Sequence, residues 1–116
     1  MKSDPVQKFL KENKYPAHLV REGHAGLARR WRQFVELVEK GYTLGLEDYR
    51  NDLDIRAIID RAKAEDEEIR ALDARFKKML TARKKRVWES GGFWDFGYPR
   101  NASADLLEGL RDEGLA

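Results

Sequence analysis

The chain carries one long helical signal, which runs from about Leu46 to Arg86. This stretch contains no proline and, after Gly45, no glycine, so it lacks both of the residues that most often end a helix. At a rise of about 1.5 Å per residue, forty residues would form a rod of about 60 Å, about twice the width of a small domain. The sequence therefore predicts one continuous helix over 46–86, which the rest of a 116-residue chain is too short to cover.

The apolar positions of this predicted helix fall into two sets that differ in phase. The first set is Leu46, Tyr49 and Leu53, and the second is Ile55, Ile58, Ala62, Ile69, Leu72, Phe76 and Met79. The second set keeps a heptad spacing that Glu65 interrupts. A change of phase indicates either different partners for the two halves or a local bend, and different partners are the favoured interpretation. We expect the first half to pack on the preceding helix and the second half on another copy of the chain, in a two-fold homodimer. The predicted oligomer interface is Ile69, Leu72, Phe76 and Met79.

The other elements complete an all-α fold in a single domain. A short helix is expected over 1–14, where Ser3 or Asp4 can cap free N–H groups and Pro5 suits the first turn. A second helix over 17–40 would form an antiparallel hairpin with the long helix, and Gly23 and Gly26 predict a break in its first turns. An irregular aromatic segment over 87–100 and a short helix over 103–113 would follow.

Composition excludes several classes of protein. Charged residues make up 38% of the chain and the net charge is only +2, which suits solvated helices and selects neither nucleic acid nor a membrane surface. The absence of cysteine excludes disulfides, a thiol nucleophile and cysteine-ligated metal sites. No apolar run is long enough to span a membrane and the N-terminus lacks a signal-peptide core, so we expect a cytoplasmic protein with no membrane partner.

A basic run followed by aromatic residues is the strongest binding signal in the sequence. The residues that it offers to nucleic acid are Arg83, Lys84, Lys85, Arg86, Trp88 and Trp94. Basic groups neutralise phosphates and exposed rings stack on unpaired bases. The alternative is that the rings fold back onto the apolar end of the long helix, and the large apolar area of five rings favours that packing.

A second polar cluster lies at the start of the long helix, at Asp48, Asn51, Asp52 and Arg56. Its carboxylates could line a pocket for a ligand or a hard cation. The favoured interpretation is a solvated helix face, with Arg56 paired to Asp52 four residues earlier. The sequence predicts no catalytic residues, no metal site and no cofactor, because the two histidines, His18 and His24, do not share a face and no serine lies in a nucleophile motif.

Two carboxylate pairs add a weaker resemblance. Glu36 and Glu39 are three residues apart, as are Glu65 and Glu68. These pairs resemble those with which all-α nucleotide pyrophosphatases of the MazG type hold magnesium, and the resemblance implies magnesium-dependent nucleotide hydrolysis. The Glu-x-x-Asp partner that such enzymes carry downstream is missing, so enzymatic activity ranks below a binding role.

A longer stretch resembles small uncharacterised bacterial helical proteins. The residues that carry the resemblance run from Trp31 to Tyr42 and from Leu46 to Arg56. It implies a helical hairpin and no particular activity. We therefore expect a non-enzymatic, oligomerising protein-interaction or scaffold module, with a nucleic-acid-associated accessory protein as the alternative.

Overall fold

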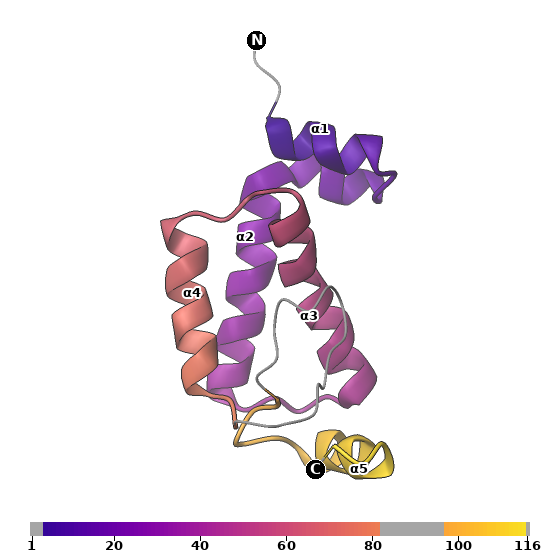
Figure 1. Ribbon diagram of the computed structural model, residues 1–116, viewed down its shortest axis with the longest axis vertical. Coiled ribbons are helices and arrows are strands. Elements are labelled where there is room, and N and C mark those ends of the chain that lie inside the picture. The colour runs from indigo at the N-terminus through magenta and orange to yellow at the C-terminus, as the bar shows by residue number, and fades with distance from the viewer. Residues whose placement is uncertain (1–3, 82–96, 116) are drawn as a thin grey trace.

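The computed structural model describes residues 4–81 and 97–115, which form five α-helices. The all-α class is therefore confirmed. The helices are α1 (Pro5–Glu12), α2 (Ala17–Lys40), α3 (Leu46–Arg61), α4 (Glu67–Lys78) and α5 (Ala104–Asp112). Helix α2 lies at the centre, with α3 on one side and α4 on the other, while α1 packs on the first turns of α2 and α5 on α3 (Figure 1).

The predicted continuous helix over 46–86 is wrong, because α3 ends at Arg61 and α4 begins at Glu67. The break is a Schellman motif built without glycine. Lys63 adopts a left-handed φ of 54°, its N–H bonds to the Asp60 carbonyl, and the Ala64 N–H bonds to the Ile59 carbonyl at 2.9 Å. A left-handed conformation costs a residue with a Cβ about 1–2 kcal/mol, and burial of both Ala64 and Ile59 at this corner offsets that cost.

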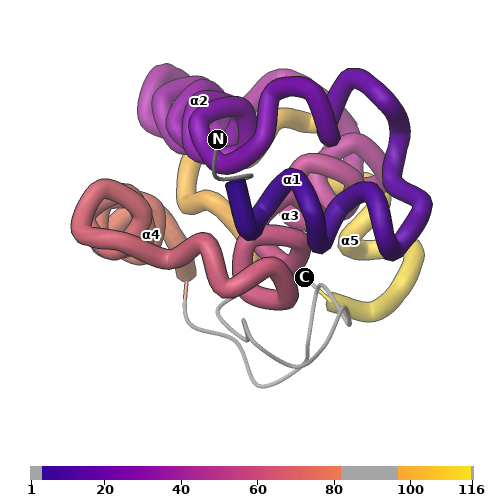
Figure 2. Tube along the Cα trace, turned by 90° about the horizontal axis from the view of Figure 1, so that it is seen from above, coloured from indigo at the N-terminus to yellow at the C-terminus, as the bar shows by residue number. Residues whose placement is uncertain are grey.

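The break lets α4 fold back beside α2, where it lies in both views of the chain (Figures 1 and 2). Asp66 begins the new helix by accepting a hydrogen bond from the Ile69 N–H at 2.9 Å. The longest dimension of the molecule is 50 Å, shorter than the predicted rod. The chain thus covers its own apolar stripe. The length of the helix therefore does not require a second copy of the chain.

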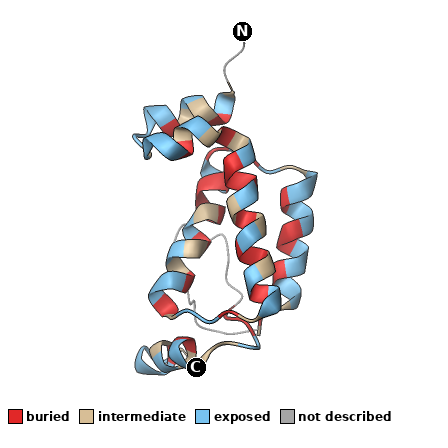
Figure 3. Cartoon of the chain, turned by 180° about the vertical axis from the view of Figure 1, so that it is seen from behind, coloured by how far each residue is buried: buried red, intermediate tan, exposed pale blue. Residues whose placement is uncertain are grey.

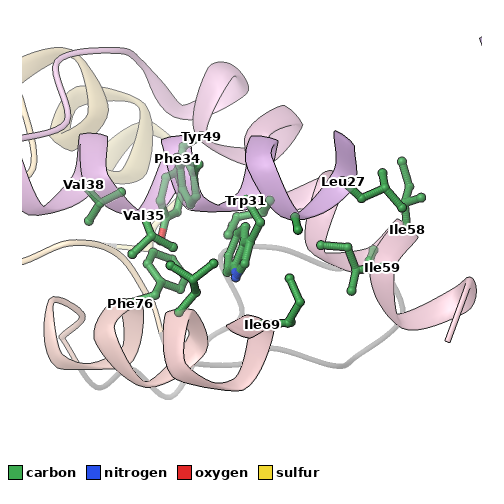
Figure 4. Packing of buried hydrophobic residues seen from close by; sticks show 14 of the residues in the cluster. Leu27, Trp31, Phe34, Val35, Val38, Tyr49, Ile58, Ile59, Ile69 and Phe76 are labelled. Carbon is green, nitrogen blue, oxygen red and sulfur yellow. The ribbon is translucent and has the colours of Figure 1, made fainter. Parts of the chain in front are cut away.

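The core is a continuous apolar layer between α2 and its two neighbours (Figures 3 and 4). Trp31 and Phe34 of α2 meet Phe76 of α4 with ring centroids 5.3 and 5.4 Å apart. Tyr49 of α3 packs on Phe34 from the other side, at 6.0 Å. These rings put the aromatic residues of α2 at the junction of all three central helices.

A buried polar group joins the same three helices. Arg56 of α3 is 1% exposed, and its Nε and Nη2 donate to the two carboxylate oxygens of Asp73 on α4, both at 3.0 Å. The Trp31 Nε1 of α2 donates to the same carboxylate at 3.0 Å, and Arg56 also lies 3.3 Å from Glu65. The bidentate bonds from Arg56 and the bond from Trp31 meet on the one carboxylate of Asp73, so this carboxylate links the three helices.

Helix α2 bends at Gly23, where the sequence predicts a break. Gly23 has φ 61° and ψ −147°, and a Cβ on it would lie 2.6 Å from Oδ2 of Asp4. That Oδ2 accepts the His24 N–H at 3.2 Å, and Oδ1 accepts the Val6 N–H at 2.9 Å. Asp4 therefore caps α1 and the main part of α2 together, while the His24 ring lies 3.0 Å from Asp66 at the start of α4.

Replacing Gly23 with alanine should lower the free energy of unfolding by about 1–3 kcal/mol, because the new Cβ would disfavour the left-handed backbone and collide with Asp4. Urea denaturation followed by circular dichroism measures the change. Gly45→Ser is the matched control, since Gly45 has open space around it and serine is a good cap for α3. A Gly23→Ala variant as stable as the parent chain would contradict the bend.

After α4 the chain returns to α5 through a short antiparallel contact. Leu80 and Pro99 form an isolated bridge, in which the Thr81 N–H bonds to the Tyr98 carbonyl and the Arg100 N–H to the Met79 carbonyl. Tyr98 is buried. This contact holds residues 79–81 beside residues 98–100.

Candidate functional site

A basic groove lies between α1 and the first turns of α2. It comprises two hollows of about 400 and 470 Å³ that share Lys11, Val20 and Arg21. Both hollows are broadly open to solvent rather than enclosed. The basic groove is lined by Gln7, Lys8, Lys11, Tyr15, Ala17, Val20 and Arg21.

The sequence of α1 places its cations at the basic groove. Val6 and Leu10 are buried against α2, so Lys8 and Lys11, three residues apart, come to the groove side. The Gln7 Nε2 donates to the Arg21 carbonyl at 3.1 Å and so ties α1 to α2.

A tight corner between α1 and α2 sets the end of the basic groove. Lys14 has φ 62°, and the Tyr15 N–H bonds to the Leu10 carbonyl at 3.0 Å, which is another Schellman motif. The Tyr15 ring packs on Phe9 at 6.1 Å, and its hydroxyl accepts a hydrogen bond from Arg61 at 3.2 Å. Tyr15 is therefore held in place from both sides.

The charge of the basic groove has one sign. Its three cations stand around Ala17 and Val20, and no acid of residues 4–81 or 97–115 lines it. Glu12 contacts Lys8 at 4.0 Å with both side chains mostly in water, so that pair is weak. Within the described residues, Lys11 and Arg21 form no ion pair. The groove thus offers an anionic, partly apolar ligand a positive field over an apolar floor.

The predicted oligomer interface lies in the core instead. Ile69, Leu72 and Phe76 are at most 3% exposed within one chain, and Met79 is half-buried. They pack toward α2 because α4 folds back at residues 62–66. The homodimer stays a prediction, without the geometric argument that led to it.

The predicted polar cluster is split between two environments. Asp48 and Asn51 are exposed, and Asp52 accepts a hydrogen bond from the Tyr42 hydroxyl at 2.8 Å. The expected pairing of Arg56 with Asp52 is wrong, because Arg56 turns inward to Asp73. A carboxylate inside the core offers a stronger interaction than one on the surface of the same helix.

Asp52 gives a pH dependence with a definite sign. Burial first, and then repulsion from Asp48, raises the pKa of its carboxyl group, although the Tyr42 hydrogen bond opposes this. Folding therefore disfavours the charged form, and the resulting loss of stability develops as pH rises from the unfolded-state pKa to the folded-state pKa. Asp52→Asn should be more stable than the parent at neutral pH, by less than about 1 kcal/mol, with the difference vanishing below the unfolded-state pKa of about 3.9. Urea denaturation across this pH range measures it, and a difference that grows on acidification would contradict it.

The remaining predicted sites fall into two groups. The nucleic-acid candidates Arg83, Lys84, Lys85, Arg86, Trp88 and Trp94 lie outside the described residues. The carboxylates of the pyrophosphatase resemblance each contact an arginine: Glu36 and Glu68 contact Arg32, Glu39 contacts Arg75, and Glu65 contacts Arg56. Across residues 4–81 and 97–115, no group of three or more histidine and acidic side chains is arranged to hold a metal ion.

The basic groove was not predicted from the sequence. Its cations are dispersed among other charged residues, and only the corner at Lys14 brings α1 and α2 together. The available signal was the spacing of Lys8 and Lys11 opposite the buried face of α1.

Comparisons with other proteins do not change this picture. No protein-family model matches the chain, and neither a curated protein nor a solved structure shows significant similarity to it. None of the described helices is both long enough and apolar enough to cross a lipid bilayer.

Proposed function

We propose that this protein is a non-enzymatic helical protein-interaction module that holds an acidic, amphipathic segment of a partner protein in the basic groove. The observation that carries the proposal is the set of three cations around an apolar floor, with no acid among the described residues of the lining. Acidic side chains of the partner would meet Lys8, Lys11 and Arg21, and an apolar side chain would cover Ala17 and Val20.

The lining favours a peptide over a nucleic acid. Base stacking needs accessible ring faces, and the one ring of the basic groove, Tyr15, packs on Phe9 and bonds to Arg61. The floor is aliphatic, which suits a leucine or isoleucine side chain. The groove cations also stand about one helical turn apart on α1, the spacing at which acids repeat on a partner helix.

A labelled model peptide tests the proposal. The peptide repeats glutamate at helical spacing around leucine anchors, and its control carries glutamine in place of every glutamate. Fluorescence anisotropy should give a micromolar Kd for the acidic peptide, weakening as salt rises, and no saturable binding for the glutamine control. A single-stranded oligonucleotide is titrated in parallel.

Charge reversal at the basic groove provides the decisive comparison. Lys11→Glu combined with Arg21→Glu should weaken peptide binding at least about tenfold, which corresponds to about 1.4 kcal/mol. Arg70→Glu combined with Arg111→Glu changes the net charge equally at exposed positions outside the groove and should change the Kd by less than about twofold. Equal losses in the two double variants would refute the groove as the site. Tighter groove-dependent binding of the oligonucleotide would instead favour the nucleic-acid alternative.

A further inference from the structure

A second hollow, separate from the basic groove, lies between α2 and α3. We call it the α2–α3 cleft; it measures about 230 Å³ and is lined by Arg30, Gln33, Phe34, Leu37, Asp52 and Ile55. This volume is below the usual range for drug-sized ligands. A ligand that fits it would be about the size of a single free amino acid.

Asp52 makes one part of the α2–α3 cleft negative. Its carboxylate is half-buried and receives the Tyr42 hydroxyl at 2.8 Å. Asp48 adds a further negative charge nearby, and among the described residues no cation shifts the pKa of Asp52. Burial therefore makes the charged form of this carboxylate costly, and a bound cation would relieve that cost.

Arg30 makes another part of the cleft positive. The Arg30 Nη2 donates to both carboxylate oxygens of Glu22, each at 3.2 Å. The Arg30 Nε is buried and has no acceptor among the described residues. Arg30 lines the cleft with a side chain that is 33% exposed, so a ligand carboxylate can pair with the accessible part of its guanidinium.

Apolar side chains complete the lining. Phe34 is buried, Ile55 is half-buried and Leu37 is 37% exposed. Leu37 and Leu44 are the large apolar side chains that remain exposed in the described part of the chain, and only Leu37 lines this cleft. An aliphatic or aromatic ligand side chain would cover this surface.

We propose that the α2–α3 cleft binds a small apolar amino acid as its zwitterion, with the ammonium on Asp52, the carboxylate on Arg30 and the side chain over Phe34, Leu37 and Ile55. Each of the three chemical features of such a ligand meets a matching feature of the lining. This inference does not depend on the basic groove, which shares no residue with the cleft.

Calorimetric titration of the full chain with leucine and phenylalanine tests the inference. At least one of them should bind with a Kd of about 1 mM or tighter. N-acetylleucine, which lacks the ammonium, and leucinamide, which lacks the carboxylate, should each bind at least about tenfold more weakly than leucine. Failure of both amino acids to saturate, or equal binding of leucine and leucinamide, would overturn the proposal.

Paired variants locate the site. Asp52→Asn should weaken leucine binding at least about tenfold without loss of stability, whereas Asp105→Asn, at an exposed position on α5, should not change it. Leu37→Trp should fill the cleft and abolish binding, while Leu44→Trp, at the exposed leucine outside it, should leave binding intact. Thermal unfolding confirms that each variant is folded. Leucine binding that survives both Asp52→Asn and Leu37→Trp would place the site elsewhere and overturn the assignment.

Discussion

Replacing Arg56 with methionine should lower the free energy of unfolding by about 3–5 kcal/mol, because it leaves the carboxylate of Asp73 buried without its countercharge. A domain of this size is stable by only about 6–17 kcal/mol, so the loss is a large fraction of the total. Methionine retains much of the volume, and the effect therefore reports charge rather than a cavity. Urea denaturation followed by circular dichroism measures it.

Two companion variants isolate the cause. Arg50→Met removes a bidentate pair with Glu113 that is partly exposed to water and should cost less than about 1 kcal/mol. Adding Asp73→Asn to Arg56→Met removes the stranded charge, and the asparagine oxygen can still accept the Trp31 Nε1. The combined variant should be more stable than Arg56→Met alone. If Arg56→Met costs no more than Arg50→Met, the ion pair does not lie in the core.

Replacing Phe76 with alanine should lower the free energy of unfolding by about 3–5 kcal/mol. Phe76 is fully buried between Trp31 and Phe34, so its removal leaves a cavity lined by rings. Because those contacts lie within one chain, the unfolding midpoints of the parent and the variant should not depend on protein concentration.

Chemical denaturation over a hundredfold range of protein concentration measures the free energy of unfolding and the concentration dependence of the midpoint. Light scattering measures the oligomeric state. Met79→Ala is the control, because Met79 is half-buried at the end of the same apolar stripe. It should lower the free energy of unfolding by less than Phe76→Ala does. A Phe76→Ala variant that keeps its stability but dissociates from a dimer would restore the predicted oligomer interface.

The sequence was sufficient for the fold class and for most helix boundaries. The apolar spacing over 17–40 and the Asp4–Pro5 start both correspond to observed helices, and Gly23 marks a real bend. These features depend on local propensity and on a helical period, which a single sequence expresses directly.

The break between α3 and α4 was not predictable from the absence of glycine and proline. Lys63 takes the left-handed conformation because the buried corner and the cap at Asp66 compensate for its cost, and those are tertiary effects. Glu65 interrupting the apolar period was the one sequence signal at this point. In a single rod over 46–86, the apolar stripe of α4 would have no cover from its own chain, and this led to the predicted dimer interface.

The sites, like the helices, were predictable only where they depend on residues that are close in the sequence. Arg56 has Asp52 four residues away, and local spacing favoured that pair over Asp73, which is seventeen residues away and reaches Arg56 only after α4 folds back. The basic groove likewise depends on the corner at Lys14. In both cases the residue types were visible in the sequence and the juxtaposition was not.

Distance measurement between spin labels on α2 and α4 tests most directly whether the chain covers its own apolar stripe. The chain has no cysteine, so Glu39→Cys and Arg75→Cys allow specific labelling at two surface positions whose native side chains pair. With excess unlabelled protein to suppress contacts between chains, the labels should lie near the spacing of packed helices, whose axes are about 8–10 Å apart. On a continuous helix that begins at residue 46 beside the end of α2, Arg75 would lie about 45 Å from that start. A separation of about that length would contradict the fold described for α3 and α4.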